Sequence, residues 1–143
     1  MHKARILLVD DEEQFVETLA ERLQTRGLEV TTAFSGDEAL VKLREKDVDV
    51  VVLDVLMPGK SGTDTLREIK RLKPLTEVIM LTGNATVETA IEGMKLGAYD
   101  YLMKPTETKD LVEKINVAYK RKAEHEDRIR QAEIDRIAKS RGW

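Results

Sequence analysis

Hydrophobic residues along this chain occur in short unbroken runs that alternate with stretches of helical spacing. The runs are RILLV at 5–9, EVTTA at 29–33, VVVL at 50–53, EVIML at 77–81 and YLM at 101–103. Three of the runs lack polar alternation, which is typical of strands buried on both faces of a parallel sheet. The pattern therefore predicts five strands, with the most buried ones inside the sheet.

The stretches between the runs are predicted to be helices. The first, third and fourth predicted helices cover 12–26, 63–73 and 86–96. The second begins at a capping box formed by Ser35 and Glu38, and the last begins near 106–109. Gly27 and Gly97 follow the first and fourth of these segments, and Pro74 follows the third. Glycine just after a helix and proline shortly beyond it are common stop signals.

The order of these elements predicts the fold. Five strand-then-helix units with short connections indicate an α/β protein with right-handed crossovers. We expect an open, doubly wound, five-stranded parallel sheet of flavodoxin-like type, with strand order 2-1-3-4-5. A chain of 143 residues has room for one such domain, which we place at 1–121.

The last part of the chain differs in kind, and we expect 122–143 to extend the last helix beyond the domain. More than half of the residues in 120–143 are charged, and opposite charges recur at helical spacing. A solvated single helix fits this pattern. An incomplete apolar stripe also fits pairing with a second copy of the chain. The stripe consists of Ile129, Ala132, Ile134, Ile137 and Ala138. Lys122 and His125 interrupt any heptad seam.

Composition narrows the classes of partner. The net charge is only −3, from 24 basic and 27 acidic residues, so we expect no membrane binding and no direct nucleic-acid binding. The absence of cysteine excludes disulfides, thiolate metal sites and cysteine nucleophiles. No apolar span is long enough for a signal peptide or a membrane helix. We expect a soluble, cytoplasmic protein.

Reactive side chains follow every predicted strand except the second. Asp10 and Asp11 follow the first strand, Asp54 the third, Thr82 ends the fourth, and Lys104 follows the fifth. In open α/β sheets, ligands bind at the carboxyl ends of the strands where the winding direction reverses, which here lies between strands 1 and 3. We therefore expect these five side chains in one pocket.

Three carboxylates close together need a positive partner, because like charges oppose each other's ionisation. The chain offers oxygen ligands only at this place, since its two histidines lie at positions 2 and 125. Such sites suit Mg²⁺. Lys104 can pair with one carboxylate, or with an anionic group that joins the site. An aspartate can also attack phosphorus, and Thr82 could donate a hydrogen bond to a phosphoryl oxygen, so the pocket is suited to receiving a phosphoryl group.

Each of these residues has a simpler explanation when taken alone. An aspartate pair caps helices, Asp54 and Thr82 are typical turn residues, and a lysine before a proline usually lies in a surface loop. These explanations do not account well for the occurrence of all of these residues together at four strand ends.

Four segments carry a family resemblance: LLVDDEE, VVVLDVLMPGKSG, VIMLTG and GAYDYLMKP. In this order and spacing they resemble the receiver domain of two-component response regulators, over about residues 4–121. The resemblance implies that Asp54 accepts a phosphoryl group from a sensor histidine kinase and that the domain is a signalling switch rather than an enzyme. The segment from Leu81 to Pro105 is most similar to receivers of enhancer-binding, NtrC-like AAA+ regulators.

The resemblance also implies roles for individual residues. Asp11, Asp54 and the Leu56 carbonyl would bind Mg²⁺ directly, and Asp10 mainly through water. Thr82 and Lys104 would contact the phosphoryl group. Tyr101 matches the switching aromatic residue of the family, and the bond from Lys104 to Pro105 would be cis.

No GxxxxGK[ST] motif and no helix-turn-helix follows, so the chain is either a single-domain regulator or part of a longer one.

Two other classes remain as alternatives. A Mg²⁺-dependent phosphohydrolase acting through an aspartyl phosphate usually needs a second aspartate two residues after the nucleophile, where this chain has Leu56. A flavodoxin-like cofactor binder should have a phosphate loop rich in Ser, Thr and Gly, whereas DDEE would repel a phosphate. Leu56 and Asn84 each lie two residues after a site residue, where attacking water approaches. We expect apolar Leu56 to slow self-dephosphorylation.

Overall fold

The computed structural model describes residues 3–83 and 86–142 of the chain, which form ten elements of secondary structure. They are β1 (Arg5–Val9), α1 (Glu13–Thr25), β2 (Glu29–Ala33), α2 (Gly36–Glu45), β3 (Val50–Leu53), α3 (Gly62–Leu72), β4 (Glu77–Thr82), α4 (Val87–Lys95), β5 (Asp100–Met103) and α5 (Thr108–Ser140). Each lies within a few residues of the position predicted from the hydrophobic pattern.

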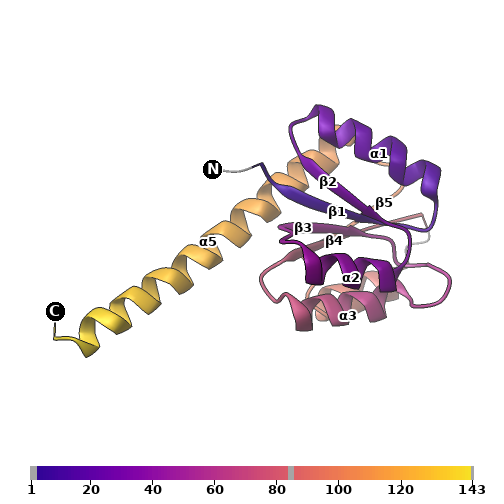
Figure 1. Cartoon of the computed structure of the whole chain (residues 1–143). Helices are drawn as coiled ribbons and strands as arrows, with labels where there is room; N and C mark the ends of the chain where they lie inside the picture. The colour runs from indigo at the N-terminus through magenta and orange to yellow at the C-terminus, as the bar shows by residue number, and fades with distance from the viewer. Residues whose placement is uncertain (1–2, 84–85, 143) are drawn as a thin grey trace.

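The five strands form one parallel sheet in the order β2-β1-β3-β4-β5 (Figure 1). This confirms the predicted topology. Val9 pairs with Leu53, and Leu53 in turn pairs with Met80, so the carboxyl ends of the three central strands lie side by side. The edge strands β2 and β5 are less buried than β3 and β4, whose residues are all buried. The three runs without polar alternation are therefore the central strands.

Helices cover both faces of the sheet, and alternate strand residues point to opposite sides. Leu7, Val51 and Met80 belong to one core cluster, which also contains residues of α2 and α3. Ile6, Val52 and their neighbours on the other face pack against α1 and α5. This two-sided burial is why the middle of each central strand is apolar, with polar residues such as Arg5, Glu77 and Thr82 only at the strand ends.

Helix ends follow the predicted stop and start signals. Gly27 and Gly97 have φ of 84° and 105° and follow α1 and α4, in the left-handed region that glycine adopts without strain. Ser35 caps α2 as predicted, by accepting a hydrogen bond from the Glu38 N–H. The carboxylate of Glu38, however, accepts from the N–H of Phe34 rather than from that of Ser35. The predicted box is therefore only half formed.

Helix α5 is one continuous helix of 33 residues, and Figure 1 shows its second half projecting away from the sheet. Its buried residues are Leu111, Ile115, Ala118 and Lys122, on the side that faces the domain. Lys122, the first residue of the predicted extension, is thus still in contact with the domain. No helix in the described parts of the chain combines the length and apolarity needed to cross a membrane.

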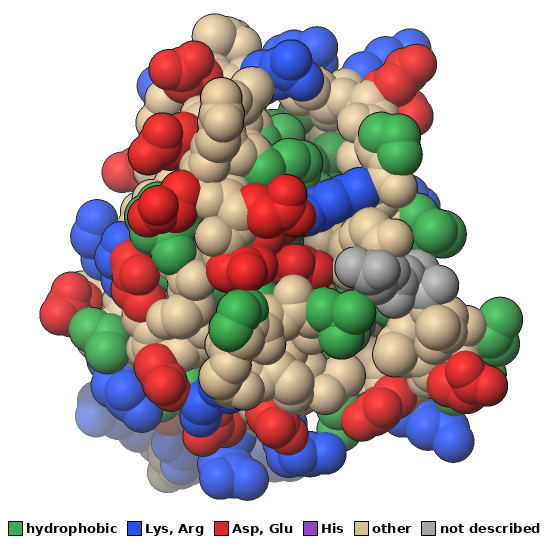
Figure 2. Space-filling model, turned by 90° about the vertical axis from the view of Figure 1, so that its right-hand side faces the viewer, with side chains coloured by type: hydrophobic (Ala, Val, Ile, Leu, Met, Phe, Trp, Pro, Cys, Tyr) green, Lys and Arg blue, Asp and Glu red, His purple; other side chains and the backbone are tan. Residues whose placement is uncertain are grey.

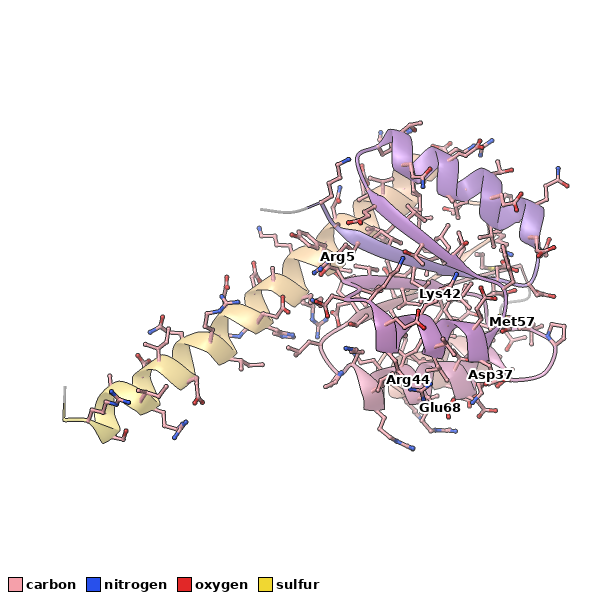
Figure 3. All side chains as sticks on the ribbon, in the orientation of Figure 1. Arg5, Asp37, Lys42, Arg44, Met57 and Glu68 are labelled. Carbon is pink, nitrogen blue, oxygen red and sulfur yellow. The ribbon has the colours of Figure 1, made fainter. Side chains whose placement is uncertain are left out.

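The two ends of the sheet differ in what they carry. Figure 3 shows Arg5 near the end where the central strands begin and Met57 in the loop at the opposite end, where they finish. The candidate site lies at the Met57 end.

Candidate functional site

The three carboxylates predicted to meet where the winding direction of the sheet reverses do lie together there. Carboxylate oxygens of Asp10, Asp11 and Asp54 all lie within 4.8 Å of one another. The N–H of Asp54 bonds the carbonyl of Val9, which couples the end of β3 to the end of β1 at an N–O distance of 2.9 Å. Asp10 and Asp54 are buried, whereas Asp11 is exposed. Figure 2 views this end of the sheet and shows acidic side chains gathered beside a basic one.

Lys104 supplies the positive charge beside this cluster. Its Nζ lies 2.5 Å from an Asp10 carboxylate oxygen and 3.4 Å from one of Glu12. Its backbone N–H bonds the Thr82 carbonyl at 2.8 Å, and the bond to Pro105 is cis, as the resemblance implies. Burial disfavours the Lys104 ammonium, but the hydrogen bond to Asp10 and the surrounding carboxylates outweigh burial and raise its pKa. Lys104 is therefore held in its charged form.

Asp54 is buried and only partly compensated within the cluster. Burial raises the pKa of its carboxyl group and the Asp10 charge adds to this effect, while a hydrogen bond from Thr82 and the Lys104 charge oppose it. The Leu56 N–H reaches its Oδ1 at 3.4 Å, which is a long contact. The net direction is upward, so the ionised form of Asp54 is less favoured in this site than in water.

The loop after β3 is held in place by its own packing. Val55 and Met57 are buried, whereas Leu56 between them is 52% exposed at the mouth of the site. The N–H of Gly62 bonds the Val55 carbonyl at 2.8 Å, and Ser61 caps α3 by accepting from the Asp64 N–H. A Cβ atom at Gly62 would collide with the backbone of Asp54 and Val55. Glycine here allows α3 to start directly against the Asp54 loop.

Thr82 and Tyr101 lie on neighbouring strands. Thr82 is fully buried at the end of β4, and Tyr101 on β5 is half-buried. The Tyr101 hydroxyl lies 3.0 Å from the Thr89 hydroxyl on α4, within hydrogen-bonding distance. Of the remaining sequence candidates, Asn84 and His2 lie outside the described residues, and His125 is on the far half of α5.

Three contacts at the site were not predicted from the sequence. Glu12 is a second carboxylate partner of Lys104, the Lys104 ammonium lies 4.1 Å from the Phe15 ring centroid, and Thr89 bonds Tyr101. The only signal for Phe15 was its inward position in the helical pattern. Nothing local to Glu12 or Thr89 distinguishes them from other polar residues of a first helical turn.

The fold and these side chains define a class: a doubly wound α/β domain whose topological switch point holds an acidic pocket flanked by a hydroxyl and an ammonium group. Within that class, the chain belongs to the response regulator receiver domain family, which matches residues 6–116. This confirms the family expected from the four motifs, and nothing in the comparisons supports the phosphohydrolase alternative.

Similar proteins agree with this assignment. The transcriptional regulatory protein ZraR of Salmonella typhimurium is 41% identical over 116 residues, which is 81% of this chain and 26% of ZraR. A response regulator receiver domain protein of Clostridium thermocellum is 43% identical with a TM-score of 0.80, covering 84% of this chain and 97% of that one.

A further structure comes from Burkholderia pseudomallei: a response regulator protein with a phosphorylated aspartic acid, calcium ion and citrate. It is 27% identical with a TM-score of 0.76, covering 98% of this chain and 86% of that one. The chain spans between 26% and 53% of the length of the curated relatives compared with it.

Proposed function

We propose that this chain is a phosphorelay switch in which Asp54 accepts a phosphoryl group from the phosphohistidine of a sensor histidine kinase. The observation that carries the proposal is the environment of Asp54. It is a buried carboxylate whose pKa is raised, and it lies among two more carboxylates with a hydroxyl and an ammonium group on the next strands. A site of this kind is suited to gaining a divalent cation and then an anionic group.

The residues present fit Mg²⁺. Asp11, Asp54 and the Leu56 carbonyl would hold it directly, with Asp10 acting through water, because an all-oxygen set with room for water is what this ion prefers. When bound, the ion would neutralise charge on the carboxylates and on the transferring group. The calcium ion and the phosphorylated aspartic acid in the Burkholderia relative support this assignment.

The transfer step needs little from the protein beyond positioning. A carboxylate oxygen of Asp54 attacks phosphorus, a P–O bond forms, and the P–N bond to the kinase histidine breaks, with its electron pair going to the imidazole nitrogen. The Thr82 hydroxyl and the Lys104 ammonium would contact the phosphoryl oxygens. Lys104 is well placed to bind the phosphoryl group, because its ammonium is already held in the charged form beside Asp10.

Phosphorylation would then act on the face formed by α4, β5 and α5. As Thr82 moves towards the phosphoryl group, Tyr101 turns into the space it leaves and gives up its bond with Thr89. The α4 residues Val87, Ile91 and Met94 are 74%, 50% and 48% exposed, which suits a surface that a partner covers.

The projecting half of α5 offers a second output. Ile129, Ile134 and Ile137 are 57%, 51% and 39% exposed on the part of α5 that projects beyond the domain. We propose that two copies pair through this segment, so that phosphorylation changes how the two helices meet.

The deciding experiment is incubation with Mg²⁺ and acetyl phosphate, followed by intact-mass measurement of wild type and Asp54→Asn. We expect one labile phosphoryl group on the wild type and none on the variant. A wild type without mass gain, or a variant that gains as much, would refute the proposal. Multiple turnover on a small phosphate ester, abolished in the same variant, would favour the phosphohydrolase instead.

A further inference from the structure

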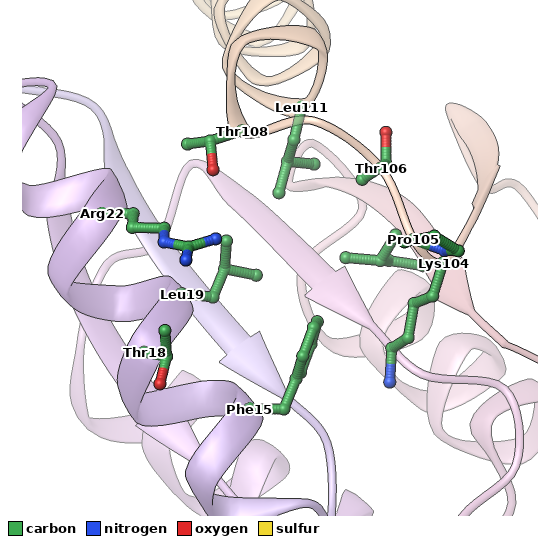
Figure 4. A pocket seen from close by; sticks show the side chains of 10 residues that line it. Phe15, Thr18, Leu19, Arg22, Lys104, Pro105, Thr106, Thr108 and Leu111 are labelled. Atoms are coloured by element: carbon green, nitrogen blue, oxygen red, sulfur yellow. The ribbon is translucent and has the colours of Figure 1, made fainter.

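A cavity of about 170 Å³ lies between α1 and the start of α5 (Figure 4), and Lys104, which pairs with Asp10, forms part of its wall. Most of its wall is apolar, formed by Phe15, Leu19 and Leu81 together with Pro105 and Leu111. This apolar wall offers water no hydrogen-bond partner, whereas Thr18, Thr106 and Thr108 also line the space. An apolar group that displaced the water would be favoured there.

The polar groups of the cavity are mostly positive or neutral. Figure 4 shows Arg22 of α1 directed into the space from the left and Thr108 of α5 from above. Lys104 is engaged with Asp10 and Glu12, but Arg22 pairs with no carboxylate in the described chain. Glu107, the residue that caps α5, makes no side-chain bond to the first turn of that helix. The cavity therefore has an exposed guanidinium without a carboxylate partner among the described residues, at the edge of an apolar wall.

We propose that this cavity is a binding site for a small carboxylate with an apolar body, of the size of an arylalkyl acid. The ring would lie against Leu19 and the face of Phe15 that Lys104 leaves open. The carboxylate would accept hydrogen bonds from Arg22 and the Thr108 hydroxyl. A fork of guanidinium donors matches a carboxylate in geometry as well as in charge. None of these contacts requires Asp54 or a metal ion.

Binding in the cavity would also restrict the motion of Lys104. Its ammonium lies over the Phe15 ring, and its stem and Pro105 form part of the cavity wall. An occupant would restrict these side chains and so link the concentration of a metabolite-sized acid to the phosphorylation site.

The test uses hydrocinnamate as the probe, with hydrocinnamyl alcohol as its neutral counterpart of nearly the same shape. Binding is followed by amide and methyl chemical shifts of the full chain without Mg²⁺ or a phosphoryl donor, so the outcome is independent of the proposed function. For a ligand of about ten non-hydrogen atoms we expect a Kd of about 1 mM. Saturable shifts should centre on Leu19, Thr108 and Leu111.

Three variants locate the site and its charge selectivity. Arg22→Gln should weaken hydrocinnamate binding about tenfold and leave the alcohol unaffected, because a charge-assisted pair is lost. Arg44→Gln, an exposed arginine on α2, is the matched control and should change nothing. Thr18→Trp places a large side chain at an exposed position of the lining and should abolish binding.

The proposal is overturned by absence of saturable shifts in the wild type, by equal affinity for acid and alcohol, or by unchanged affinity in Arg22→Gln. Shifts centred on α4 or on the projecting half of α5 would overturn it as well.

Discussion

Ionised Asp54 destabilises the folded state of the metal-free protein. Burial raises the pKa of its carboxyl group above the ordinary value of 3.8, and Asp10 adds to this effect. A carboxyl group whose pKa is higher in the folded than in the unfolded state destabilises the folded state at pH values where the group is ionised. It has no such effect at pH values where the group is protonated. The penalty is therefore absent below the ordinary pKa, develops as the pH rises through the window up to the folded pKa, and is complete above it.

Asp54→Asn removes this penalty, so the metal-free variant should be more stable than the wild type at neutral pH. We expect a gain of about 1 kcal/mol, or roughly 3 °C to 5 °C in Tm, by thermal unfolding in chelator. The gain should shrink as the pH falls towards the ordinary pKa.

Added Mg²⁺ provides the control for this prediction. It should raise the Tm of the wild type more than that of Asp54→Asn and so narrow the gap between them. A variant less stable than the wild type in chelator at neutral pH would contradict the prediction.

We predict that Leu56 limits how well water is oriented for attack at the site. Its side chain is 52% exposed beside Asp54 and has no group that can orient a water molecule. Leu56→Asn should speed loss of the phosphoryl group roughly fivefold, which corresponds to one hydrogen bond of about 1 kcal/mol in the transition state. The measurement is the decay of phosphorylated protein by intact mass in Mg²⁺, with Leu56→Met as the apolar control. Equal or slower decay in Leu56→Asn would count against this role.

At the scale of elements, α5 is fastened to the sheet by a buried ion pair. Lys122 Nζ lies 3.0 Å from Asp49 Oδ1, and the two side chains are only 9% and 2% exposed. Asp49 precedes β3 and also accepts from Arg5 at the start of β1. Lys122 was predicted only as a break in a heptad seam. Its contacts show that it anchors α5 where the helix leaves the domain.

Lys122→Met should therefore destabilise the domain by about 2 kcal/mol, less than for a fully isolated buried charge because Arg5 remains beside Asp49. Lys120→Met, an exposed change on the same helix, is the control and should have little effect in chemical denaturation. A Lys122 variant as stable as the control would show that the pair does not hold α5.

The pH dependence of this anchor has a definite sign. Burial lowers the pKa of Lys122, but its hydrogen bonds to Asp49 and Glu126 outweigh burial and raise it above 10.5. The stabilisation is therefore complete below the unfolded pKa and is lost as the pH rises through the folded pKa. The stability difference between wild type and Lys122→Met should shrink only in strongly alkaline solution.

For the whole molecule, the projecting half of α5 is the part that the domain does not stabilise. Residues 127–140 of this helix lie beyond Lys122 and Glu126 and are almost all exposed. A lone helix of this length is marginal in water, so pairing with a second copy would stabilise it.

A chain that ends after Glu126 should keep its Tm and its phosphorylation within error. It should be monomeric in sedimentation, where the full chain associates with increasing concentration. Ile129→Lys in the full chain should reproduce the loss of association with α5 intact. A full chain that stays monomeric at about 0.1 mM would refute pairing through α5.

The hydrophobic pattern was sufficient to predict most of the fold. Burial on both faces leaves unbroken apolar runs such as VVVL, and glycine after helices marks their ends, because both effects act over a few residues. The residues at the strand ends predicted the candidate site for a related reason. The residues at strand ends are brought together by the topology itself, so their neighbourhood follows once the strand order is known.

What the sequence by itself determined is the strand order, the helix stops and the gathering of Asp10, Asp11, Asp54, Thr82 and Lys104 at one edge. Only the tertiary structure decided which of these touch. Lys104 pairs with Asp10 across 94 positions of sequence, and Lys122 with Asp49 across 73. Local periodicity reports which side of an element is buried. It does not report which distant side chain fills the same few ångströms, because that depends on how two elements pack against the sheet.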